Sequence, residues 1–153
     1  MKMRPLFFFM YVIILFILML LWSKITPLIQ IFSWIPNIAV LITFLAGHII
    51  GRRFGILTGA YLGLIEDFMT GFFGFGLLSK TLTGFISGHF FRVNESYNQI
   101  NFVYGLLTAC FVNGMIYNGL YFYSEQEFSK TLAQFVAPET VYTLAMGFFI
   151  YYI

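Results

Sequence analysis

Two residues of opposite charge stand within apolar sequence and are the first candidates for chemistry. Asp67 and Lys80 each lie in a largely apolar segment that is bounded by glycines. A charged side chain within a membrane span costs roughly 2.5–3.5 kcal/mol on insertion scales, so it needs a partner or water. Three roles stay open: a salt bridge that staples two helices, a contact for a partner protein, or a site for a substrate or ion. Glu66 is expected to point to a different helix face and to reach water.

The other reactive residue types form no catalytic or metal-binding pattern. Cys110 is the only cysteine, and His48 and His89 are the only histidines, so neither an internal disulfide nor a Cys/His zinc site is predicted. The sequence has no nucleophile elbow and no phosphate-binding motif. We therefore expect no enzymatic activity, no metal and no cofactor. The histidines are expected to be hydrogen-bonded near helix ends, and Asn113 and Asn118 to form interhelical hydrogen bonds.

Glycines recur every four residues on both sides of a turn near residue 73. The series before the turn is Gly55, Gly59, Gly63, Asp67 and Gly71, and the series after it is Gly76, Lys80, Gly84 and Gly88. Residues four apart share one helix face, and small residues let helices approach closely in lipid. We therefore predict a tight antiparallel helix pair. Folding at Phe73–Gly74 would set the following pairs face to face: Gly59 with Gly88, Gly63 with Gly84, Asp67 with Lys80, and Gly71 with Gly76.

The composition is that of an integral membrane protein. Of the 153 residues, 60% are hydrophobic and only 9% are charged, whereas soluble domains carry about 25% charged residues. The net charge of +2 is too small and too scattered for a nucleic-acid surface. The length suits a single transmembrane domain over residues 1–153.

Six apolar segments predict an all-α, polytopic six-helix bundle. A spanning helix needs about 20 residues, and the segments are 5–22, 36–51, 54–71, 76–92, 100–123 and 136–153. The connector 23–35 is expected to lie in the membrane interface. The connector 124–135 is expected to form an amphipathic surface helix.

The positive residues predict that both termini are cytoplasmic. With the N-terminus inside, the cytoplasmic side carries Lys2, Arg4, Arg52, Arg53 and Arg92, and the outer connectors carry Lys24 and Lys130. Cytoplasmic loops of membrane proteins are enriched in lysine and arginine. Glu139 is expected on the outer side.

The segment from Gly63 to Gly88 resembles the MreD family of rod-shape-determining membrane proteins. That family has an apolar segment with an aspartate four residues before a glycine, then a short Leu/Gly-rich turn, then a helix with paired glycines near its end. The matching positions here are Asp67, Gly71, Gly76, Gly84 and Gly88. Pro36-Asn37 is similar to the family's Pro-Asp or Pro-Asn entry into the second span. The motif covers about residues 35–92, and length and hydropathy agree over the whole chain.

The resemblance implies a subunit of the bacterial cell-wall elongation machinery in the cytoplasmic (inner) membrane. Expected partners are an MreC-like single-span protein and, through it, a SEDS-family glycosyltransferase and a class B penicillin-binding protein, besides membrane lipids. The implied fold is similar to the substrate-binding subunits of energy-coupling-factor vitamin transporters. Asp67, Lys80 and the glycines at 59, 63, 71, 84 and 88 are then structural or partner-binding residues.

The rival function is a substrate-binding subunit of a small-molecule transporter. A transporter is expected to place polar groups around a cavity and to use broken helices at the site. Most polar residues outside the connectors are small, and the ionisable pair lies near one end of its helices. These features predict a packed bundle without a binding cavity and favour a non-catalytic scaffold.

Overall fold

The chain folds into helices only, over the residues that the structure describes. The computed structural model describes residues 5–29, 35–90, 99–121, 134 and 136–152, and these contain six α-helices and no strand. The helices are α1 (Pro5–Ile29), α2 (Ile38–Ile49), α3 (Arg52–Thr70), α4 (Phe75–Ser87), α5 (Gln99–Tyr121) and α7 (Ala137–Tyr152), with a 3₁₀ turn, η1 (Gly88–Phe90), after α4. The predicted all-α class is therefore confirmed. The predicted amphipathic helix at 124–135 lies almost entirely outside the described residues.

Helix α1 is longer than predicted. It runs to Ile29, through Pro27, although the sequence suggested an interfacial connector from residue 23 onward. A proline so near the end of a helix removes only one main-chain hydrogen bond. The side chain of Thr26 also donates to the Trp22 carbonyl (2.8 Å) within this last stretch. Helix α1 therefore includes the first seven residues of the predicted connector.

Two helices are long and apolar enough to cross a membrane by length and composition. They are α1, over Phe9–Leu28, and α5, over Ile100–Leu120. Helices α2 and α4 have 12 and 13 residues and are therefore only about 20 Å long, against about 30 Å for the hydrocarbon core of a bilayer. The predicted apolar segments are thus helices of unequal length.

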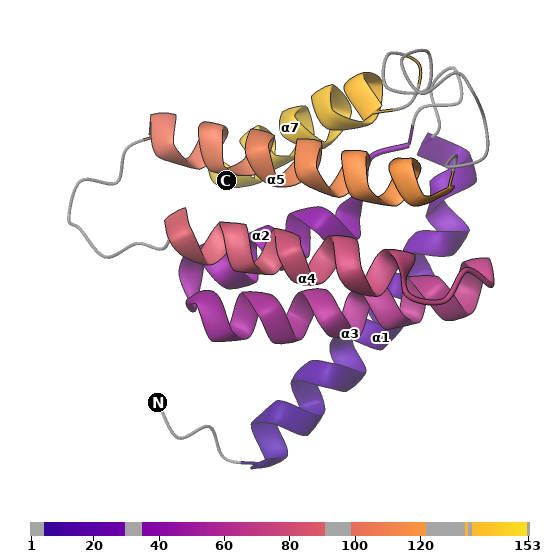
Figure 1. The fold of residues 1–153 in the computed structure, drawn as a ribbon. Coiled ribbons are helices and arrows are strands. Elements are labelled where there is room, and N and C mark those ends of the chain that lie inside the picture. The colour runs from indigo at the N-terminus through magenta and orange to yellow at the C-terminus, as the bar shows by residue number, and fades with distance from the viewer. Residues whose placement is uncertain (1–4, 30–34, 91–98, 122–133, 135, 153) are drawn as a thin grey trace.

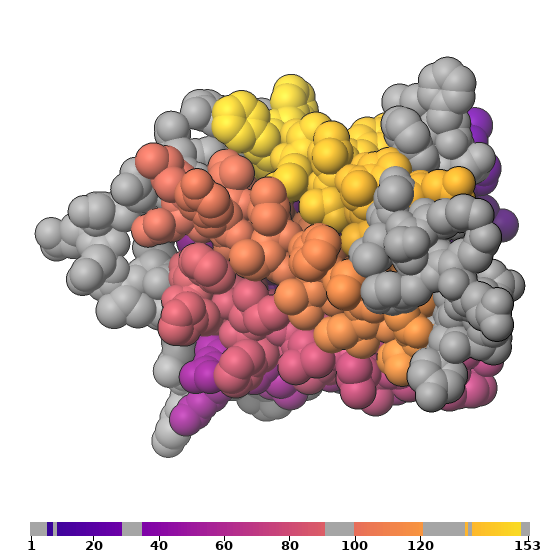
Figure 2. All heavy atoms as spheres, turned by 45° about the horizontal axis from the view of Figure 1, so that its top comes forward, coloured from indigo at the N-terminus to yellow at the C-terminus, as the bar shows by residue number. Residues whose placement is uncertain are grey.

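The helices form layers around α3 and α4. These two helices lie antiparallel and share the most extensive helix–helix contact, as predicted (Figure 1). Helix α2 packs on both of them, and α5 packs on α4. Figure 2 shows α4, α5 and α7 side by side on one face. One apolar cluster joins α2 to α5 through Phe44, Phe102 and Leu106. A second joins α1 to α2 and α3 through Leu15, Ala39 and Leu62.

The turn between α3 and α4 falls where the sequence predicts it. Helix α3 ends at Gly71, which has a φ of 78° and donates its N–H to the Asp67 carbonyl (2.8 Å). Gly74, at the start of α4, has a φ of 98°. Only glycine adopts such left-handed angles without steric cost. These two residues therefore reverse the chain within four residues.

The glycine register between α3 and α4 differs from the mirror arrangement predicted above. A Cβ on Gly63 would meet the backbone of Gly76, a Cβ on Gly84 would meet Gly55, and one on Gly88 would meet Arg52. The backbones do touch through glycine, but the residue opposite Gly63 is 76 rather than 84. This difference of eight residues is about two helical turns. The predicted pairing assumed that the last residue of α3 and the first residue of α4 lie opposite each other at the turn. The side chain of Asp67 instead binds the first residues of α4 and draws them back alongside α3.

Candidate functional site

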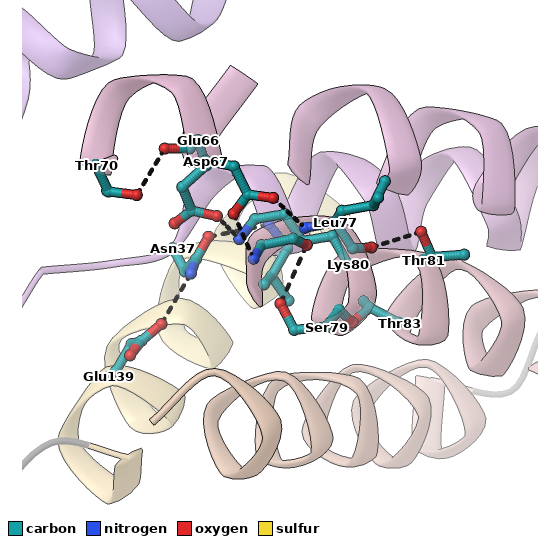
Figure 3. A network of polar contacts seen from close by, with 12 residues as sticks. Asn37, Glu66, Asp67, Thr70, Leu77, Ser79, Lys80, Thr81, Thr83 and Glu139 are labelled. Atoms are coloured by element: carbon teal, nitrogen blue, oxygen red, sulfur yellow. Dashed lines mark hydrogen bonds and ion pairs between the residues drawn. The ribbon is translucent and has the colours of Figure 1, made fainter. Parts of the chain in front are cut away.

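Asp67 caps the start of α4 and lies one turn before the end of α3. Its Oδ1 accepts a hydrogen bond from the N–H of Gly76 (2.7 Å), and its Oδ2 accepts from Gly74 (2.8 Å) and Leu77 (3.1 Å) (Figure 3). The side chain is completely buried. The first N–H groups of a helix lack intrahelical partners and carry partial positive charge. They therefore compensate this carboxylate without a cation.

Lys80 forms an ion pair with Glu66, which corrects the predicted pairing with Asp67. The Lys80 side chain is fully buried, whereas that of Glu66 is 22% exposed. The Lys80 backbone lies against Gly59, and its long side chain runs along α3 to reach the Glu66 carboxylate. Glu66 therefore contacts Lys80 and is also partly exposed. Sequence reasoning missed this because it fixed the register from glycine spacing alone.

The Glu66–Lys80 pair is expected to behave as an energetic unit. Glu66→Gln should cost roughly 3–5 kcal/mol of the free energy of unfolding, because it leaves a buried ammonium unpaired. Adding Lys80→Met should recover most of that loss, because no charge then remains to be compensated. The unfolding free energies of the wild type, Glu66→Gln, Lys80→Met and the double variant can be measured by titration with a denaturing detergent. If the double variant is as unstable as the sum of the single variants, the two residues do not interact.

Asn37 joins the start of α2 to the start of α7. Its side-chain oxygen caps α2 by accepting from the Val40 N–H (3.1 Å), and its Nδ2 donates to Oε1 of Glu139 (2.9 Å). Its main-chain N–H donates to the Thr143 hydroxyl (3.0 Å). Pro36-Asn37 was noticed in the sequence as a helix entry, but nothing there indicated the contact with residues more than 100 positions away.

A cavity of about 450 Å³ lies where these helix ends meet. Its lining includes the carboxylates of Glu66 and Glu139 and the amides of Asn37 and Asn118. The rest of the lining is Met19, Trp22, Ser23, Thr26, Ile35, Pro36, Ile38, Ala39, Met69 and Tyr117. This cavity corrects the expectation of a packed bundle without one. It also places Glu139 on the wall of a cavity, where sequence reasoning had put it simply on the outer side. Polar residues that are scattered in the sequence gather here because helix ends from α1, α2, α3, α5 and α7 converge.

The other candidate residues have packing or local roles. His48 is buried and stacks on Phe44, with ring centroids 5.5 Å apart. Asn118 donates to the Gly114 carbonyl of its own helix (3.0 Å), and the interhelical hydrogen bond predicted for it is not seen among the described residues. The buried Asn113 Oδ1 has no hydrogen-bond partner among the described residues, so the bond predicted for it is also not seen there. Within the same residues, no three His, Cys, Asp or Glu side chains gather as a metal site would require.

The glycines singled out in the sequence have structural positions. Gly59, Gly63 and Gly84 lie on the buried contact between α3 and α4, where a side chain would meet the opposite backbone. Gly88 lies against Arg52 at the far end of the same pair, and Gly71 closes α3 at the turn. These residues fix the distance between the two helices, and Asp67 and Lys80 fix their register.

Comparison of the chain with protein-family models, with curated proteins and with solved structures finds no match.

Proposed function

We propose that this protein is a non-catalytic integral membrane scaffold that binds other membrane proteins of the cell-wall elongation complex. In this proposal all six helices lie in the cytoplasmic membrane of a bacterium and both termini are cytoplasmic. The partners are an MreC-like single-span protein and, through it, the wall synthases. The resemblance of residues 63–88 to the MreD family supplies these partners.

One observation carries the binding role: polar side chains are buried between the helices, while large apolar side chains are exposed on the outer helices as well as on α3 and α4. Large apolar residues are exposed along α1, including Phe7, Phe9 and Phe16, of which Phe9 is 65% exposed. Exposed aromatic residues also mark α5, at Tyr104 and Phe111. In lipid, such faces are available for helix association through packing. The glycine contacts hold α3 and α4 together, so the other helices are free to meet partners.

Co-purification tests this proposal. The full chain, expressed with a tagged MreC-like protein and purified in mild detergent, is expected to be retained with it when no small molecule is added. Phe9→Leu with Phe16→Leu should raise the dissociation constant about fivefold and so lower the retained fraction, because a loss near 1 kcal/mol in binding corresponds to that factor in Kd. Both changes keep the α1 face apolar but alter its shape.

The matched control makes the same exchange at the tip of the α3–α4 hairpin. Phe68 and Phe73 are as exposed as Phe9, and their rings contact each other edge to face with ring centroids 5.4 Å apart. Replacing both with leucine should leave co-purification unchanged. Equal losses from the two double variants would mean that α1 is not the partner-binding helix.

The cavity supports a second candidate function, a substrate-binding subunit of a small-molecule transporter. Ligand pockets are typically about 300–1,000 Å³ in volume, and this cavity falls within that range. Strong binding of a soluble, vitamin-sized solute without any association with elongation proteins would replace the scaffold proposal with this one.

A further inference from the structure

The walls of the cavity between α1 and the ends of α2, α3, α5 and α7 carry more negative than positive charge. Glu66 is neutralised by Lys80, and the nearby Asp67 is neutralised by the backbone amides of α4. Glu139 accepts one hydrogen bond from Asn37 but has no basic nitrogen within 4.0 Å among the described residues. Within the described residues, the two carboxyl groups on the wall therefore face a single ammonium, that of Lys80.

A carboxylate in such surroundings favours a cation. Removing a charge from water is costly unless an opposite charge compensates it. Much of the surrounding wall is apolar, with Met19, Ile38 and Ala39 among its residues. The site therefore suits a cation that carries apolar groups better than a small hydrated metal ion.

Two aromatic rings on the same wall add a second feature of ammonium sites. Trp22 and Tyr117 both line the cavity. The faces of tryptophan and tyrosine attract ammonium groups within about 6 Å of the ring centroid. The Lys80 Nζ already lies 5.5 Å from the centroid of the Tyr117 ring, so this ring faces one ammonium group in the protein itself.

We propose that this cavity binds an organic ammonium group carried on an apolar body, with Glu139 as its charge partner and the rings of Trp22 and Tyr117 beside it. The same chemistry is offered by the headgroup of an aminophospholipid and by a free arylalkylamine. The inference does not rest on the scaffold role, because partner binding was assigned to Phe9 and Phe16 on α1, and neither residue lines this cavity.

The first experiment compares ligands with and without an ammonium group on the purified full chain in neutral detergent. Native mass spectrometry with an equimolar mixture of phosphatidylethanolamine and phosphatidylglycerol of identical acyl chains tests the lipid source. Thermal unfolding with 2-phenylethylamine, or with the neutral 2-phenylethanol, tests the free source. The ammonium compound is expected to bind about tenfold more tightly than its counterpart in at least one arm, which corresponds to a single favourable charge interaction.

Two variants assign that preference to the cavity. Glu139→Gln keeps an oxygen that accepts from Asn37 and removes only the charge, so the ammonium preference should disappear. Ser23→Phe fills the cavity from α1 and should weaken binding of every ligand. Leu21→Phe is the control, because Leu21 is 58% exposed on the same helix, and it should leave binding unchanged.

Each outcome decides the proposal or the source of the ligand. A preference for phosphatidylethanolamine that Glu139→Gln abolishes assigns a lipid headgroup, and stabilisation by 2-phenylethylamine alone assigns a free amine. The proposal is overturned if neither arm prefers the ammonium compound, if the preference survives in Glu139→Gln, or if Ser23→Phe binds every ligand as well as Leu21→Phe does. Should Glu139→Gln fail to fold, the comparison of Ser23→Phe with Leu21→Phe still gives this answer.

Discussion

Gly84→Leu is expected to separate α3 from α4 and to lower the free energy of unfolding by about 3 kcal/mol or more. A Cβ at Gly84 would overlap the carbonyl group of Gly55 on the facing helix. That obstacle is backbone, which cannot rotate aside as a side chain can, so the helices themselves must move. The movement would also disturb the burial of Lys80, which lies one turn earlier on α4.

The measurement is equilibrium unfolding of the purified chain in detergent, followed by circular dichroism. Ala145→Leu is the matched control, since it enlarges a small residue on the exposed side of α7 and should change the free energy of unfolding by less than about 0.5 kcal/mol. If Gly84→Leu is as stable as this control, the close contact between α3 and α4 is wrong.

Asp67→Asn is expected to loosen the α3–α4 turn and to cost about 3–5 kcal/mol in the free energy of unfolding. The aspartate accepts three backbone hydrogen bonds, and hydrogen bonds to a charged group contribute about 1.5–3 kcal/mol each. Asparagine keeps one acceptor oxygen and turns an NH₂ group toward N–H donors. At least one buried N–H group then loses its partner.

Adding Lys80→Met to Asp67→Asn separates the capping role from the ion pair first suggested by the sequence. Because Lys80 pairs with Glu66, we expect no recovery in this double variant and a further loss from the unpaired Glu66. Hydrogen exchange at the amides of residues 74, 76 and 77 should accelerate in Asp67→Asn alone. Recovery of wild-type stability in the double variant would instead support a direct Asp67–Lys80 pair.

The sequence by itself determined the number and order of the described helices and where α3 turns into α4, but not that α1 continues to Ile29. Apolar runs bounded by polar or glycine residues predicted every described α-helix, because main-chain hydrogen bonding and apolar patterning are local properties. The four-residue recurrence of glycine likewise predicted that α3 and α4 pack most closely. Glycines four apart lie on one face of their own helix, so each such face can be recognised from local sequence. Asp67, Gly71 and Gly84 were therefore found as important residues before their contacts were known.

Only the tertiary structure decided the register of those helices and the partners of their charged groups. Helical periodicity repeats every turn, so a shift of whole turns along α4 keeps the glycines in contact and cannot be recognised from spacing. In the observed register the Asp67 carboxylate binds amides beyond the turn, and Lys80 pairs with Glu66. The cavity and the contact of Asn37 with Glu139 are likewise decided only by the tertiary structure. They join residues more than 100 positions apart, and such contacts form where helix ends converge in space.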